Sequence, residues 1–247
     1  MDSIKNIRLE DITVFDIETA GEYQNPHNLP LSTIDQFWKR HKGKNTDRQK
    51  WEEEKLEESW WSKCGVDPVF GKVLCVSFAQ YKDSSHTEMK TTTISSHNEK
   101  EVLEKVAKVV EAVGKRGGVL GGHNIKIFDL PFLAWRMMAN GVRVPKLLDV
   151  FGKKAWSLKN HLDTLEIWQG AGYTKPALSS LCYLLNIPTP KNDIDGSMVG
   201  KVYWNNDNVD LEGNVWEDGL ERVAVYCEKD VIANLELFKK MYENQKL

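Results

Sequence analysis

Apolar positions alternate between short extended runs and longer helical patterns along the chain. The β-branched and aromatic residues of 9–17 predict a buried strand. Similar runs predict strands over 72–81, 87–95 and 117–122. Helix-like spacing and end signals predict helices over 98–114, 129–140, 177–186 and 219–243. This order predicts an α/β fold, a mixed sheet flanked by helices.

The remaining segments have weaker patterns. We expect a short extended piece at 147–149 and a long polar connection over 184–219. Residues 22–70 form a charged excursion, in which 47–61 is typical of a charged helix carrying Trp51, Leu56 and Trp60. These tryptophans either stack on bases beside a site, worth ~1–3 kcal/mol each, or pack onto the core, which we favour. Without internal repeats or low-complexity linkers, we expect 1–247 to form a single domain.

The first candidate site lies at the end of the first predicted strand. Asp16 and Glu18 are two residues apart, so a strand places both side chains on one face. Adjacent carboxylates repel each other, and burial would raise their pKa values. A cation relieves both penalties, and oxygen ligands suit Mg²⁺ or Mn²⁺. The alternative is a strand end whose acids simply meet solvent.

Two later segments carry further acids. Asp129 precedes Leu130 and Pro131 at a predicted helix start, where Asp is a good N-cap, so capping alone also explains it. Tyr226 and Asp230 are spaced i, i+4 on the last predicted helix and share a face. The alternative is a half-buried core tyrosine beside a solvated aspartate. In H-L-D-T-L-E-I-W, a structural role is favoured for Asp163.

Composition limits the functional classes. With 247 residues, 41% hydrophobic and 28% charged, the chain is long enough for a substantial core. It has no apolar run of membrane-spanning length and no signal-peptide core, and its four cysteines form no C-x-x-C pair. We therefore expect a cytoplasmic protein with reduced cysteines and no membrane partner.

The net charge of −3 counts mildly against nucleic acid, because binders that neutralise phosphates are usually basic. Bound cations would attract the scissile phosphate, and local basic residues would neutralise the other phosphates. The candidates are Lys39, Arg40, Lys42, Lys44, Lys153, Lys154 and Lys159, although a solvated charged surface is the favoured interpretation of any single one.

Together, the three acidic segments resemble the DEDD superfamily of 3′→5′ exonucleases. The D-x-E motif of that superfamily matches Asp16 and Glu18. Its second motif, N-x-x-x-F/Y-D-x-P, matches Asn124, Phe128, Asp129 and Pro131. The Y-x-x-x-D motif of the tyrosine branch (DEDDy) matches Tyr226 and Asp230, whereas the histidine branch would have a His where this chain has Val225. Residues 180–188 also resemble the exonuclease domain of family B DNA polymerases and their stand-alone bacterial relatives.

The resemblance implies an RNase H-like fold and a two-metal mechanism. Asp16, Glu18, Asp129 and Asp230 would hold two Mg²⁺ or Mn²⁺ ions, with Asp16 between them, and Tyr226 would orient the attacking water. Asn124 would contact the terminal nucleotide or brace the site. The substrate would be nucleic acid, single-stranded DNA before RNA, cut to nucleoside 5′-monophosphates, with a possible place in DNA repair. The competing hypothesis is an inactive nucleic-acid-binding module on the same fold, which would be expected to have lost one of these acids.

Overall fold

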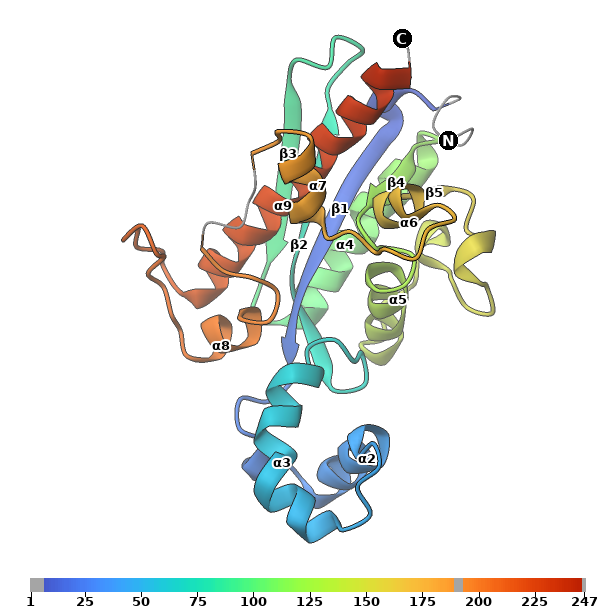
Figure 1. Ribbon diagram of the computed structural model, residues 1–247. Coiled ribbons are helices and arrows are strands. Elements are labelled where there is room, and N and C mark those ends of the chain that lie inside the picture. The colour runs from blue at the N-terminus through green and yellow to red at the C-terminus, as the bar shows by residue number, and fades with distance from the viewer. Residues whose placement is uncertain (1–6, 189–192, 246–247) are drawn as a thin grey trace.

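A five-stranded mixed sheet forms the centre of the protein in the computed structural model, which describes residues 7–188 and 193–245 (Figure 1). The strands are β1 (Ile12–Gly21), β2 (Gly71–Tyr81), β3 (Met89–Ser95), β4 (Val119–Gly122) and β5 (His161–Asp163), in the spatial order β3-β2-β1-β4-β5. The pairs β1–β2 and β2–β3 are antiparallel, whereas β1–β4 and β4–β5 are parallel. The predicted fold class, a mixed α/β sheet with flanking helices, is confirmed.

Alternation along β1 divides the core between the two faces of the sheet. Phe15 and Ile17 pack with α4 (Glu99–Lys115) and α5 (Asp129–Ala139). Ile12 and Val14 pack with α9 (Gly219–Gln245) and α7 (Leu178–Leu184). Figure 1 shows α9, in red, running along the sheet. Because side chains alternate along a strand, Asp16 and Glu18 continue the face that Ile12 and Val14 present to α9.

Several short elements were not predicted from the sequence. The 3₁₀ helices are η1 (Leu9–Asp11), η2 (Pro26–Asn28), η3 (Lys146–Leu148) and η4 (Ala155–Ser157), and η3 replaces the extended piece expected at 147–149. Strand β5 and helix α6 (Thr164–Gln169) were not predicted, because three residues cannot establish a period. Helix α8 (Val199–Trp204) lies within the expected polar connection, of which 189–192 are outside the described residues.

The excursion at 22–70 contains α2 (Leu31–His41) and α3 (Arg48–Lys63). The predicted charged helix at 47–61 is confirmed as α3, capped by Asp47, whereas α2 was not predicted. Trp51 and Trp60 are 3% and 0% exposed and pack with Phe37 and Phe70. Packing therefore accounts for both tryptophans, and neither is available to stack on a base.

No helix among the described residues is long and apolar enough to cross a membrane. All four cysteines are buried and free of disulfides, as expected from the sequence.

Candidate active site

Strand β1 supplies the first two acids of the site. Asp16 is half-buried and Glu18 is 8% exposed. Burial raises the pKa of both carboxyls well above the usual range, and the charges of neighbouring acids raise them further. The interpretation of these residues as solvent-facing strand-end acids is therefore wrong.

Asp129 is delivered to the same place by α5. Its carboxylate Oδ1 accepts a hydrogen bond from the Ile17 amide at 3.2 Å, between the two acids of β1. The N-cap position of α5 belongs to Phe128, so the expectation that Asp129 caps this helix is wrong. Burial raises the pKa of Asp129 to about 8, and the negative charge of Asp163 contributes. Asp129, at the start of α5, therefore holds β1 through the Ile17 amide instead of capping its own helix.

Asp163 holds the turn that positions Asp129. At 2% exposed, its carboxylate accepts the amides of Asn124 at 2.8 Å and Lys126 at 3.0 Å, and it caps α6 through the Leu165 amide at 3.0 Å. Asn124 has a left-handed backbone with φ 64°, which asparagine tolerates well. The favoured structural role of Asp163 is confirmed: the end of β5 fixes the turn leading into α5.

Helix α9 supplies Tyr226 and Asp230, which are 5% and 9% exposed. The alternative of a solvated Asp230 is therefore wrong. Burial raises the pKa of the Tyr226 phenol far above its ordinary value. The charges of Asp230, Glu18 and Asp16, and a hydrogen bond with Asp230, act in the same direction. Tyr226 is consequently a neutral hydrogen-bonding phenol throughout the physiological pH range.

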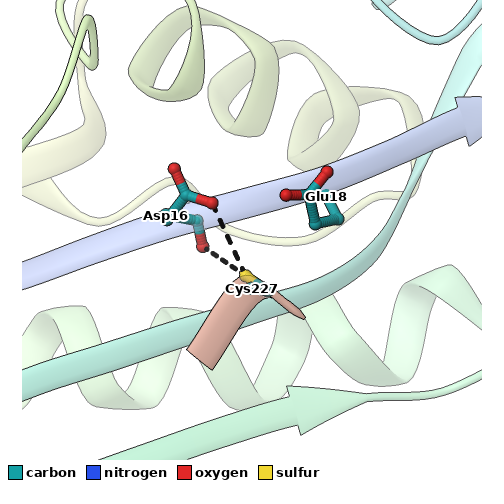
Figure 2. Close-up of side chains that lie close together, drawn as sticks. All are labelled: Asp16, Glu18 and Cys227. Atoms are coloured by element: carbon teal, nitrogen blue, oxygen red, sulfur yellow. Dashed lines mark hydrogen bonds between the residues drawn. The ribbon is translucent and has the colours of Figure 1, made fainter. Parts of the chain in front are cut away.

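Cys227 is a site residue that sequence reasoning missed. Its Sγ lies 3.4 Å from the Asp16 backbone oxygen and 3.7 Å from Asp16 Oδ2. The thiol and the carboxylates of Asp16 and Glu18 offer ligand atoms within 4.8 Å of one another (Figure 2). The available signal was its position, directly after Tyr226 on the helix that faces β1. Burial raises the pKa of this thiol well above its usual range, so it is protonated at neutral pH.

The four acids interact as one electrostatic group. The charges of Asp129 and Asp230 both raise the pKa of Asp16, and Asp16, Asp230 and Asp129 all raise that of Glu18. Buried carboxylates that disfavour one another's ionisation are the ligand set that a hard divalent cation stabilises. The donor chemistry therefore fits Mg²⁺ or Mn²⁺.

Asn124 lies in the turn that leads into α5. Its backbone carbonyl accepts the Ile127 and Phe128 amides at 3.2 and 3.1 Å, and its side chain is half-buried. It shapes the turn before Asp129 through its backbone.

Fold and site together define the class of protein: an α/β domain with a buried acidic site on its central strand. The chain belongs to the family of predicted 3′→5′ exonucleases related to the exonuclease domain of PolB, whose model matches residues 66–246. Family membership implies a nucleic-acid substrate.

Among solved structures, the family B DNA polymerase of the archaeon Pyrobaculum calidifontis is similar, with a TM-score of 0.51 and 15% sequence identity. The likeness covers 94% of this chain and 24% of the polymerase, so this chain corresponds to a small part of that enzyme. At this identity the likeness shows the fold alone. No curated protein matches the chain in sequence.

Proposed function

We propose that this protein is a two-metal-dependent 3′→5′ exonuclease that degrades single-stranded DNA to nucleoside 5′-monophosphates. The observation that carries the proposal is that Asp129 from α5 and Asp230 from α9 both raise the pKa values of Asp16 and Glu18 on β1, which brings the four acids together electrostatically. Such a cluster is costly to bury and has a clear use in holding divalent cations for phosphodiester hydrolysis.

Mg²⁺ or Mn²⁺ would be held by these carboxylates. Asp16, Glu18 and Asp230 would hold one ion, with Asp16 shared. Because Asp129 Oδ1 is engaged by the Ile17 amide, Asp129 would assist the second ion through its other oxygen or through water. When bound, the ions would supply an activated water and neutralise charge on the phosphate and the leaving 3′-oxygen.

Tyr226 would orient the attacking water. A phenol whose pKa lies above its usual value of about 10 stays protonated and is a poor general base, so its oxygen would hold the water by accepting a hydrogen bond from it. Its partner Asp230 fixes its direction, which is what an orienting residue requires. Asn124, on the turn before Asp129, would contact the terminal nucleotide.

Single-stranded DNA is the proposed substrate because the family is related to a polymerase exonuclease domain. RNA is the competing substrate. DNA and RNA would present the same phosphodiester to the acids, so the preference between them depends on contacts to the sugar.

The test is incubation of the protein with end-labelled single-stranded DNA, duplex DNA and RNA, followed by sizing of the products. We expect stepwise shortening from the 3′ end with Mg²⁺ or Mn²⁺, and none with EDTA. Asp16→Ala should lower the rate at least ~10³-fold, or ~4 kcal/mol of barrier. Asp83→Ala, which removes an exposed acid from the β2–β3 turn, is the matched control and should leave the rate unchanged. Near-full activity of Asp16→Ala would end the proposal.

A further inference from the structure

A basic groove lies at the amino ends of β4 and β5, away from the acids. Its volume is about 920 Å³, and its walls are the end of α4 and residues 143–161. Five cations line it, against the two acids Glu111 and Asp149. The cations are Lys115, Arg143, Lys146, Lys153 and Lys159. In a chain with a net charge of −3, this is a local concentration of positive charge.

Most of the positive charges of this groove are exposed to solvent and could contact a ligand. Lys115, Arg143, Lys146 and Lys159 are exposed and form no ion pair with any residue in 7–188 or 193–245. Lys153 donates to the Asp149 backbone oxygen at 2.5 Å and lies 3.7 Å from its carboxylate. The other four cations, held near one another and exposed, favour an anionic ligand.

The groove is preformed on a fixed base. His161 is 7% exposed, and its Nε2–H donates to the Leu147 carbonyl at 2.7 Å, which ties η3 to β5. Leu148 and Leu158 are buried beneath the same segment. Little ordering would therefore accompany binding of a ligand along these walls.

The cleft beside Glu18 has the opposite charge. It measures about 930 Å³ and separates the end of β1 from α3. Its α3 wall presents Glu52, Glu53, Glu54, Glu57 and Glu58, and Lys201 stands across from them. Repulsion from this wall disfavours a phosphate backbone on the α3 side of the site. A nucleic-acid strand with its 3′ end at the acids would therefore extend toward the basic groove.

An exposed aromatic stands next to the groove. Trp156, in η4, is 73% exposed, and the Lys154 ammonium lies 5.7 Å from its ring centroid. Exposed aromatics interleaved with cations are the usual means of binding single-stranded nucleic acid without sequence preference. Figure 1 shows this yellow segment beside β5, at the edge of the sheet.

We propose that this groove binds the phosphate backbone of the single-stranded nucleic-acid substrate upstream of its 3′ end, with Trp156 stacking on a base. The inference rests on the proposed function and extends it to the course of the strand. β5 runs from His161, in the groove wall, to Asp163, behind the turn that carries Asn124. The two residue steps of β5 span about 7 Å, so a nucleic acid that leaves the site past Asn124 would follow this edge of the sheet to the groove.

Binding is tested first, without hydrolysis. The fluorescence anisotropy of a labelled oligothymidylate is measured in EDTA over a range of salt concentrations. Lys146→Gln/Lys159→Gln should weaken binding about 10-fold. The slope of log K against log[salt] should fall by about 0.7 for each phosphate contact removed. Trp156→Ala should weaken binding without changing the slope. The matched control, Lys50→Gln/Lys240→Gln, removes two exposed lysines from α3 and the end of α9 and should change neither quantity.

Kinetics then separate this proposal from the exonuclease assignment. With Mg²⁺ or Mn²⁺, the double Lys variant should raise KM for a long strand about 10-fold. Its rate on a nucleoside 5′-(p-nitrophenyl phosphate), which is too small to reach the groove, should be unchanged. Affinity and salt slope equal to wild type would overturn the groove proposal while leaving the exonuclease intact. Salt-dependent binding at the groove without metal-dependent hydrolysis would instead overturn the exonuclease assignment.

Discussion

Asp129 Oδ1 accepts the amide hydrogen of Ile17 at 3.2 Å, and this one bond ties the start of α5 to the strand residue between Asp16 and Glu18. The bond places a third acid beside two that already repel each other. Its charge raises the pKa of both neighbours, and its own pKa is raised to about 8. The site is therefore strained electrostatically without cations, and its behaviour should change sharply when they bind.

Asp129→Asn tests this arrangement. An amide oxygen can still accept from the Ile17 amide, but the negative charge is lost. We expect the rate of strand shortening to fall at least ~10³-fold, or ~4 kcal/mol of barrier. We also expect the Tm of the metal-free variant at pH about 8 to equal or exceed that of wild type, because a carboxylate repulsion is removed.

The contrasting variant is Asp163→Asn, which replaces a buried carboxylate that accepts several backbone amides. It should lower Tm, because charge-assisted hydrogen bonds are lost. A lower Tm for Asp129→Asn than for Asp163→Asn would contradict the assignment of these two acids.

The metal-free protein should lose stability as pH rises. Folding raises the pKa of Asp129 to about 8 and that of Asp16 and Glu18 well above normal, so the folded state keeps protons that the unfolded chain releases. Stability contributed by these groups is present below the unfolded pKa of about 4 and is lost as pH rises toward about 8. Thermal unfolding in EDTA across this range should show a falling Tm.

Divalent cations should reverse that loss. Metal binding requires deprotonated ligands, so the rise in Tm caused by Mg²⁺ or Mn²⁺ should grow between pH about 6 and 8. Asp16→Asn should flatten both dependences. A metal-induced shift that is independent of pH would argue against coordination by these carboxylates.

Tyr226→Phe separates orientation from proton transfer. Removing the hydroxyl should lower kcat ~10²-fold, or ~2.7 kcal/mol, because the attacking water loses a positioned hydrogen bond. Since the phenol is neutral across the accessible pH range, log kcat against pH should keep its shape in the variant. If Tyr226 acted as the base, a limb of the profile would disappear on substitution.

Cys227 should make the site sensitive to thiophilic metals. A thiol within 4.8 Å of the carboxylate ligand atoms of Asp16 and Glu18 adds a soft donor that Zn²⁺ or Cd²⁺ prefers. We expect low concentrations of Cd²⁺ to inhibit wild type in the presence of Mg²⁺, and Cys227→Ser to need about 10-fold more. Equal sensitivity of the two proteins would exclude the sulfur as a ligand.

Arg136 and Glu99 join α5 to α4. Their side chains are 9% and 8% exposed, and two hydrogen bonds of 2.8 and 2.6 Å join them. Glu99 also accepts the Val73 amide of β2 at 2.8 Å. Arg136→Ala leaves a buried carboxylate without its charge partner and should cost ~3–5 kcal/mol of unfolding free energy. Urea unfolding of Arg136→Ala, and of Glu99→Gln/Arg136→Met, which should lose less, measures this.

The sequence determined the main elements and the chemical identity of the site. The runs of β1 and β2 and the periods of α4 and α9 were long enough to be recognised, and the spacing of Asp16 to Glu18 and of Tyr226 to Asp230 fixed which pairs share a face. Local patterns report such relationships because they depend only on strand and helix geometry.

Tertiary structure decided whatever depends on partners distant in the chain. The local sequence around Asp129 predicts a helix cap, and its hydrogen bond with the Ile17 amide exists only because β1 packs beside the start of α5. β5 is too short for a period, yet its final residue, Asp163, holds the turn that leads into α5. Cys227 carries no motif and becomes a site residue because α9 lies against β1. Burial, which sets the pKa values of the acids, likewise exists only once the helices cover the sheet.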